Sequence, residues 1–369
     1  MRVVELAQSC RPAFARHETF HPRFGWLRKA YEGAMISGDL FAQEDATVTL
    51  GVGKNMVNAI RYWGLAFKVL CRADDPDRPR RPGVAPSDLA TTVFSEDGWD
   101  PYLEEPATLW LLHWQLLRPP CIAPSWWIAF HLFSSLQFDD AALAGVIAEA
   151  SGAVDGWSAV VPASIKKDVD CLIRTYAQRR SGRQGLDDML DCPFRELGLI
   201  EPASRDARSY RFNIGPKPGL VDAVVAYASL DYMALASPGS AVISVARLAT
   251  DVGSPGRAFK LTEPELFDVL RRIADDVPGI SVAEPAGLKQ LYVDGSPSAE
   301  GRSILADYYR FHTRSDRTWG PTAGQQRAEL EAELVSLEER AGTDVMERLK
   351  SGARIAEVRD ELLSLGSTP

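Results

Sequence analysis

Two histidines and a glutamate stand close together near the start of the sequence, in the run His17-Glu18-Thr19-Phe20-His21. This run matches H-E-x-x-H, which places two zinc-binding imidazoles and a general-base glutamate on one face of a helix. A zinc protease needs that helix to continue through the second histidine. Pro22 follows His21 and disfavours helical geometry there. The match is therefore interpreted as accidental, and no zinc is expected.

The same stretch has a second interpretation. Charged side chains crowd it and alternate with aromatic rings; they are Arg16, His17, Glu18, Arg23, Arg28 and Lys29. They could form a solvated helix end with an Arg–Glu pair, or a surface that contacts phosphates and offers a carboxylate for catalysis. On the second interpretation, Arg16, Arg28 and Lys29 would bind DNA.

The candidate reacting group in this stretch is a pair of neighbours. Glu18 could hold a metal or remove a proton, and His17 could transfer a proton near neutral pH. Arg23 would clamp a phosphate. The alternative is that His17 and Glu18 are hydrogen-bonded core partners that position a helix.

The stretch LGVGKNMVNAIRYWG, residues 50–64, predicts a helix-turn-helix. Gly51-Val52-Gly53 supplies the tight turn before a recognition helix. Four polar side chains fall on one face of that helix: Lys54, Asn55, Asn58 and Arg61. Asn can bind adenine, Arg can bind guanine and Lys can neutralise a phosphate, so these residues are predicted to contact DNA. An ordinary amphipathic helix is the alternative. Walker A spacing is absent, so no nucleotide is expected.

The elements that would position these residues are mostly helical. Residues 10–72 show helical patterns, and Asp74–Gly83, rich in proline and charge, predicts a loop or linker. Prolines divide Pro106–Phe133 into two helices, and residues 139–180 fit further amphipathic helices.

Two later stretches predict small β elements after short helices. Phe194–Leu199 reads as a short helix before a strand at Tyr210–Ile214. Residues 244–295 read as helix, turn, helix and two β runs around Pro285-Ala286-Gly287. Thr262 and Glu265 form a capping box at the second of these helices. This order outlines a winged helix.

The expected fold is mainly α with small β wings. It is multi-domain, with winged-helix/helix-turn-helix-like modules, a helical bundle and a helical C-terminal tail. The expected parts are a helix-turn-helix-like domain at 10–80, a helical domain at 81–185, a winged-helix-like domain at 186–300 and a tail at 301–369. Leucines at helical spacing in the tail fit either packing on its own domain or a homodimer or partner surface.

Composition indicates an ordinary soluble protein, with 46% apolar and 25% charged residues and a net charge of −9. Basic residues outnumber acidic ones in residues 1–72, and the reverse holds in 325–369. No C-x-x-C pair occurs, which favours a reduced cytoplasmic compartment. The start lacks a signal-peptide core, and the most apolar run, WWIAFHLF, is too short to span a membrane.

Several carboxylate groups could hold a metal. Asp168 and Asp170 lie in KKDVD, and a second group lies in LDDMLD at residues 186–191; both are interpreted as helix surfaces. Asp100 and Glu104 are better placed, in DPYLEEPATLWLLHW. No PD-(D/E)xK, H-N-H or GIY-YIG signature is found.

Five segments in order carry a resemblance to a known family. They are RHETFHPRFGWLRK, LGVGKNMVNAIRYWG, DPYLEEPATLWLLHW, CPFRELGLI and SPGRAFKL. Over residues 10–295 the chain resembles a bacterial domain of unknown function (family 4007), best placed in the SspB component of DNA phosphorothioation systems. The family pattern falls on three sets of positions: His17, Glu18, Thr19, Phe20, Arg23, Trp26 and Leu27; Lys54, Asn55 and Arg61; Asp100, Tyr102, Glu104 and Trp110.

The resemblance implies a sequence-selective protein that nicks double-stranded DNA for sulfur-for-oxygen exchange in its backbone, in anti-phage defence. It implies a divalent metal, Mg²⁺ or Mn²⁺, and three partners: a cysteine desulfurase, a sulfurtransferase and an ATPase. A non-catalytic binder that recruits or regulates this machinery is the alternative. The metal ligands are not identified.

Overall fold

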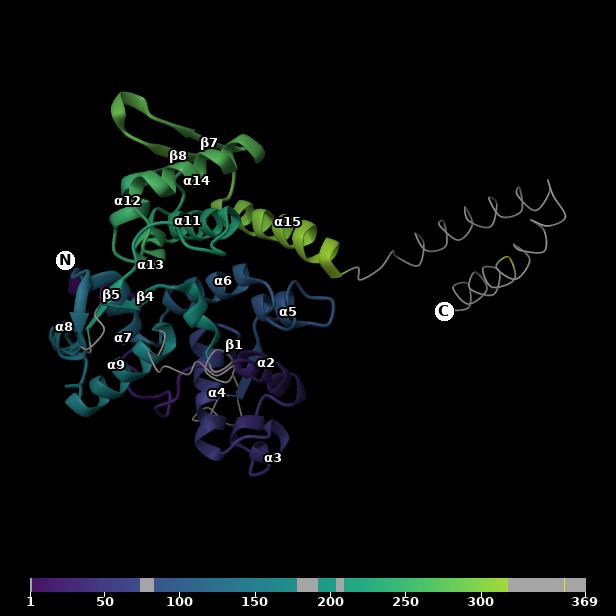
Figure 1. Cartoon of the computed structure of the whole chain (residues 1–369), viewed down its shortest axis with the longest axis vertical. Helices are drawn as coiled ribbons and strands as arrows, with labels where there is room; N and C mark the ends of the chain where they lie inside the picture. The colour runs from purple at the N-terminus through teal and green to yellow at the C-terminus, as the bar shows by residue number, and fades with distance from the viewer. Residues whose placement is uncertain (1, 74–82, 178–191, 204–208, 318–354, 356–369) are drawn as a thin grey trace. The chain divides into compact units, whose positions relative to one another are not determined.

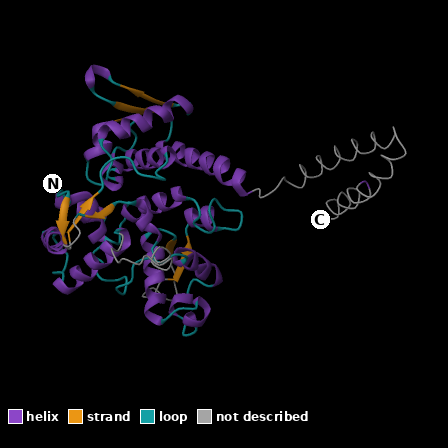
Figure 2. Cartoon of the chain, viewed as in Figure 1, coloured by secondary structure: helices purple, strands orange, loops and turns teal. Residues whose placement is uncertain are grey.

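The described residues fold mainly into helices, with three small antiparallel sheets among them (Figures 1 and 2). The structure is a computed structural model, and it describes residues 2–73, 83–177, 192–203, 209–317 and 355. Residues 1–309 form one compact unit, and residues 310–369 form a second. The predicted mainly helical fold with small sheets is confirmed. Most of the predicted tail lies outside the described residues.

The N-terminal elements are short helices and a two-stranded sheet. They are α1 (Arg2–Ser9), α2 (Trp26–Ile36), the 3₁₀ helix η1 (Leu40–Ala42), α3 (Ala46–Leu50), α4 (Lys54–Ala66), β1 (Leu70–Ala73), β2 (Gly83–Pro86) and α5 (Asp88–Phe94). β1 and β2 pair antiparallel, from Leu70 opposite Pro86 to Ala73 opposite Gly83. The boundary expected near residue 80 therefore lies between two paired strands, and the four-part division stays a prediction.

The middle elements include a helix that is buried on every side. They are α6 (Pro106–Leu117), α7 (Pro124–Trp127), the π-helix η2 (Ile128–Leu132), β3 (Gln137–Asp139), α8 (Asp140–Gly152), α9 (Pro162–Tyr176), the 3₁₀ helix η3 (Pro193–Leu197), β4 (Ile200–Pro202) and β5 (Ser209–Phe212). All residues of α6 from Ala107 to Leu117 are buried. A helix that is apolar all round belongs in a core, and α6 packs against η3, α11 and α13.

The last group repeats the order of helices followed by a hairpin. Its elements are α11 (Asp222–Ala236), β6 (Val242–Ser244), α12 (Val245–Thr250), α13 (Pro255–Phe259), α14 (Glu263–Asp276), β7 (Ile280–Ala283), the 3₁₀ helix η4 (Pro285–Gly287), β8 (Gln290–Val293) and α15 (Pro297–Arg317). The sheet order is β6-β8-β7. The predicted capping box is present at α14, where the Thr262 N–H donates to the Glu265 carboxylate at 2.8 Å.

The turn between α3 and α4 depends on a left-handed glycine. Gly51 ends α3 with φ 64° and ψ 34°, and its N–H donates to carbonyls of the preceding turn. Gly53 precedes α4 with φ −68° and ψ 160°, which any residue can adopt. A Cβ at either glycine would meet no atom within 4 Å. The two positions therefore differ in backbone conformation, whereas both have room for a side chain.

Gly51→Ala is expected to lower the free energy of unfolding by about 1–2 kcal/mol, because a side chain disfavours positive φ. Gly53→Ala is the matched control, and its effect is expected to stay within about 0.5 kcal/mol. Urea unfolding followed by circular dichroism measures both. Equal losses in the two variants would contradict this account of the turn.

Candidate nucleic-acid interface

Helix α4 presents a polar face at its N-terminal end. Lys54, Asn55 and Asn58 are exposed there. Val57 and Trp63 point into the core from the other side of the helix. The apolar spacing that buries one face therefore leaves the three predicted DNA contacts in solvent.

The first turn of α4 also presents backbone N–H groups. Gly53 has no side chain, and no side-chain hydrogen bond caps this end. The N–H groups of Met56 and Val57 donate to the Gly53 carbonyl. The N–H groups of Lys54 and Asn55 precede the first intrahelical hydrogen bonds, so this end carries partial positive charge. Such an end favours an anion.

Two arginines extend this positive region towards the hairpin. Arg61 is half-buried one helical turn beyond Asn58, and Arg72 is exposed on β1. Burial, and then the charge of Arg72, lowers the pKa of the Arg61 guanidinium. The two like charges are thus close enough to repel each other, and a bound anion would relieve that repulsion.

Arg28 and Lys29 make contacts within the protein. The Lys29 ammonium donates to the Leu50 carbonyl at 2.9 Å and so ties α2 to the end of α3. Arg28 donates to the Pro101 carbonyl and to Glu32, both at 2.6 Å. These contacts help to orient α2 and α3. Contact of Arg28 and Lys29 with DNA stays a prediction, as does that of the exposed Arg16.

The stretch around Glu18 is a turn and not a helix. No helix is assigned between Ser9 and Trp26, so the helix that a zinc motif requires is absent there. Glu18 and Thr19 have φ 50° and 65°, and the Phe20 N–H donates to the His17 carbonyl at 2.9 Å. Positive φ at both central residues is typical of a type I′ turn, and it is strained for residues with side chains.

Neighbouring elements fix this turn from two sides. The indole N–H of Trp63, on α4, donates to the Phe20 carbonyl at 2.9 Å. Arg174, on α9, donates to the Thr19 carbonyl at 2.7 Å. Glu18 itself is exposed. The turn therefore presents Glu18 to solvent in a fixed position, next to the helix that carries the polar face.

His17 points the other way, into a buried network. Its Nε2 lies 2.9 Å from Oδ1 of Asp168, and the Ala15 N–H donates to the same oxygen at 2.8 Å. The Ser125 hydroxyl donates to Oδ2 at 2.5 Å. His17 is 0% exposed and Asp168 is 2% exposed. One carboxylate thus satisfies three donors and joins the turn to α7 and α9.

Aromatic rings enclose the His17 imidazole. The Trp63 ring stacks on it at 6.0 Å between centroids, and the rings of Tyr62 and Trp126 meet it edge-on. His17 and Glu18 are therefore sequence neighbours in opposite environments. Their roles as a reacting pair stay predictions, as does that of Arg23. The Arg23 guanidinium lies over the ring of Trp26 at 5.6 Å.

Asp168 was missed by the sequence analysis, which placed KKDVD on a helix surface. Only Asp170 is exposed, whereas Asp168 is buried. The signal was present in the spacing, because Ile165, Val169 and Leu172 fall on the same face of α9 and are all buried. A lone carboxylate among such residues indicates a buried polar partner elsewhere in the chain.

The described carboxylates do not assemble a metal site. Within residues 2–73, 83–177, 192–203 and 209–317, no group of three or more His, Cys, Asp or Glu side chains is placed to hold an ion. Asp100 accepts from the N–H groups of Glu104 and Glu105 at 2.8 and 3.1 Å, so it shapes the turn before α6. The LDDMLD group lies outside the described residues.

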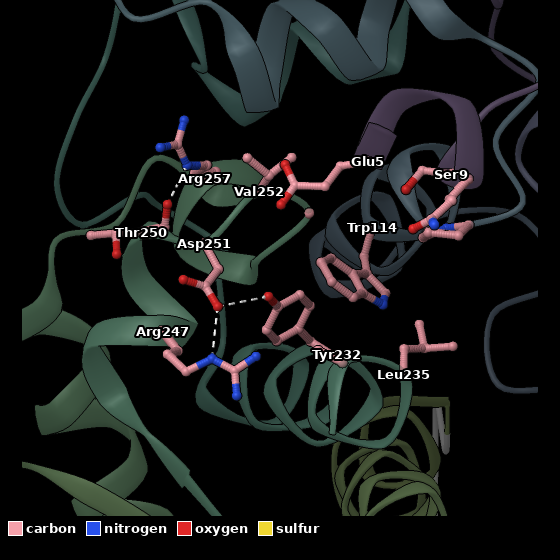
Figure 3. A pocket seen from close by; sticks show the side chains of 14 residues that line it. Glu5, Ser9, Trp114, Tyr232, Leu235, Arg247, Thr250, Asp251, Val252 and Arg257 are labelled. Atoms are coloured by element: carbon pink, nitrogen blue, oxygen red, sulfur yellow. Dashed lines mark hydrogen bonds and ion pairs between the residues drawn. The ribbon is translucent and has the colours of Figure 1, made fainter. Parts of the chain in front are cut away.

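A cavity of about 660 Å³ has no residue of α4 in its lining. Glu5 and Ser9 of α1 line it, together with Arg247, Asp251 and Arg257. Figure 3 shows that Asp251 accepts hydrogen bonds from Arg247 at 2.8 Å and from Tyr232 at 3.2 Å. It contains none of the predicted site residues.

One family model and two solved structures match this chain. No described helix is both long and apolar enough to cross a membrane. None of the curated proteins matches the chain. Two solved structures do, the "SspB crystal structure" and the "Magnesium ion-bound SspB crystal structure". Each is 40% identical with a TM-score of 0.78, and the match covers 83% of this chain and 90% of the other. Residues 14–309 match the family described as "Protein of unknown function (DUF4007)". The chain therefore belongs to the DUF4007 family.

Proposed function

We propose that the chain binds double-stranded DNA through α4 and the β1–β2 hairpin, as a winged helix. The observation that carries this proposal is the polar face of Lys54, Asn55 and Asn58 at the open end of α4. In a winged helix, the third helix enters the major groove and the hairpin lies beside it. Here α2, α3 and α4 precede the hairpin in that order. Arg61 and Arg72 would contact the adjacent backbone.

The last helix–hairpin group suits DNA less well. In the last group, α14 holds the position of the third helix, but it exposes Asp268, Asp275 and Asp276. Its Arg272 forms an ion pair with Asp222 at 2.6 Å. Carboxylates on that face would repel phosphates. The N-terminal group is therefore the proposed duplex-binding module.

The proposed enzymatic role is nicking of the bound duplex for phosphorothioate modification. Strand cleavage requires water to attack phosphorus while the bond to the leaving oxygen breaks. Glu18, exposed on a fixed and strained turn, would take the proton of that water. Arg16 and Arg23 would hold the phosphate. His17 is buried, so in this proposal it is a positioning residue.

The proposed setting is a DNA phosphorothioation system with a cysteine desulfurase, a sulfurtransferase and an ATPase as partners. A non-catalytic recruiter is the second candidate. It is favoured by the buried state of His17 and by the lack of a three-ligand metal group among the described residues. A supercoiled-plasmid assay separates the two candidates.

The purified chain with Mg²⁺ or Mn²⁺ is expected to convert supercoiled plasmid to open circle, and EDTA is expected to stop it. Glu18→Ala is expected to slow nicking by about 100-fold or more, because it removes the proposed base. Glu44→Ala, another exposed carboxylate change, serves as the control and is expected to leave the rate unchanged. Binding without nicking, under all metal conditions, would establish the recruiter.

Lys54→Ala is expected to weaken duplex binding by about tenfold and to lower the salt slope by about one, because one phosphate contact is lost. Lys166→Ala, at an exposed lysine of α9, keeps the same change of net charge and is expected to bind normally. Fluorescence anisotropy across a salt series measures both. Equal weakening in the two variants would show that only net charge matters.

A further inference from the structure

Two free cysteines from distant parts of the sequence face each other across a backbone bridge. Cys10 follows α1, and Cys121 lies between α6 and α7. The Cys121 N–H donates to the Ser9 carbonyl at 2.7 Å, and the Arg11 N–H donates to the Cys121 carbonyl at 2.8 Å. These bonds make Cys10 and Cys121 a parallel bridge pair.

A bridge pair has the geometry that a disulfide needs. Neighbouring strands lie about 4.8 Å apart, and directly opposed residues project to the same side. A disulfide forms where Cα atoms are about 4.4–6.8 Å apart with Cβ atoms facing. Both thiols are free, and both side chains are buried. The bond between them therefore requires little backbone movement.

The surroundings favour a thiolate on one member of the pair. Burial opposes ionisation of Cys121, but the hydrogen bond from Cys10 and the charge of Lys68 outweigh it, so the pKa of the Cys121 thiol is lowered. The Ala123 N–H also donates to its sulfur at 3.3 Å. Burial raises the pKa of Cys10. The Cys121 thiol is therefore the more acidic of the two.

The attachment of α1 gives this pair a structural consequence. Among the described side chains of α1, Leu6 alone is fully buried. Glu5 and Ser9 form one wall of the 660 Å³ cavity (Figure 3), and Pro119, close to Cys121, also lines it. A covalent bond after α1 would add to the burial of Leu6 and to the two backbone hydrogen bonds that help to hold that wall.

We propose that Cys10 and Cys121 are a peroxide-sensitive dithiol whose disulfide fastens α1 to the segment between α6 and α7. The Cys121 thiolate attacks one peroxide oxygen, the O–O bond breaks, and a sulfenic acid and water form. The Cys10 sulfur then attacks the sulfenic sulfur and expels a second water. Two thiols lose two electrons and two protons, and one hydrogen peroxide becomes two waters. A thiol reductant reverses the bond.

The test uses the full chain carrying Cys71→Ser, so that this exposed cysteine does not join two chains. Reduced protein is treated with hydrogen peroxide, quenched, and alkylated under denaturing conditions. We expect the loss of two alkylatable thiols, a peptide linking Cys10 to Cys121, and recovery with dithiothreitol. Unchanged thiols, or Cys10 oxidised without the linked peptide, would overturn the proposal.

A second measurement covers the structural consequence. Oxidation is expected to raise Tm by roughly 5–10 °C, because a long loop is closed in the unfolded chain. Cys10→Ser in the same background folds without this bond and is expected to show neither the linked peptide nor the rise. A rise that persists in Cys10→Ser, or a fall in Tm on oxidation of the parent, refutes the fastening of α1.

Discussion

Asp168→Ala is expected to lower the free energy of unfolding by about 3–5 kcal/mol, because it breaks a buried pair and strands its partners. The side chain accepts hydrogen bonds from the Ala15 N–H, His17 and the Ser125 hydroxyl, and it is 2% exposed. Water cannot replace these bonds without opening the core. Urea unfolding followed by circular dichroism measures the loss.

Asp170→Ala is the matched control. Asp170 lies two residues further along α9 and is exposed, so its loss is expected to cost less than about 0.5 kcal/mol. If both variants lose the same stability, the network around Asp168 does not stabilise the fold. The loss of stability in Asp168→Asn is expected to lie between those of Asp168→Ala and Asp170→Ala, because the amide oxygen can keep only part of the three interactions.

A change at His17 tests the link between the core and the proposed active surface. The His17–Asp168 pair anchors one end of the turn that presents Glu18. If His17 positions this turn, His17→Asn is expected to reduce nicking while duplex affinity through Lys54 stays unchanged. A parallel fall in both would instead indicate general loss of the fold.

The turn at Gly51 and the helix α4 could be predicted from the sequence because their signals are local. Glycine at 51 and 53 and the apolar spacing of α4 fix a turn and one buried face with no reference to the rest of the chain. The capping box at Thr262 was predictable for the same reason. Sheet β1–β2 could not be predicted in this way. Strands of four residues are too short to show a clear alternation of apolar and polar residues, and the charged, proline-rich residues between them resemble a linker.

The environment of the candidate site could not be predicted from the sequence, because the residues that contact each other there are distant in sequence. His17 and Asp168 are 151 positions apart, and the Trp63–Phe20 bond spans 43. The charges in a sequence also do not show which side chains are available to a ligand, since Arg28 and Lys29 each donate to a backbone carbonyl of the protein. Sequence indicates which groups could do chemistry. Only packing decides which of them face solvent.

Acid is expected to unfold the protein through a second buried histidine. His113 is 0% exposed and links three helices, since Nδ1 lies 2.8 Å from the Tyr176 hydroxyl and Nε2 lies 3.0 Å from the Ala258 carbonyl. The Ala258 carbonyl can only accept, so Nε2 carries the proton and Nδ1 accepts from Tyr176. Burial lowers the pKa of His113 from 6.5 to about 4.

The direction of the pH dependence follows from which state, folded or unfolded, binds the proton. Between pH 6.5 and about 4 the unfolded chain protonates this histidine and the folded chain does not, so stability falls as pH falls. At about 1.4 kcal/mol per pH unit, the full loss is about 3 kcal/mol. Burial also lowers the pKa of His131, which adds to the same trend.

His113→Gln is expected to make the loss of stability between about pH 7 and pH 5 smaller by about 2 kcal/mol. An unchanged slope in His113→Gln would show that this residue does not drive acid unfolding.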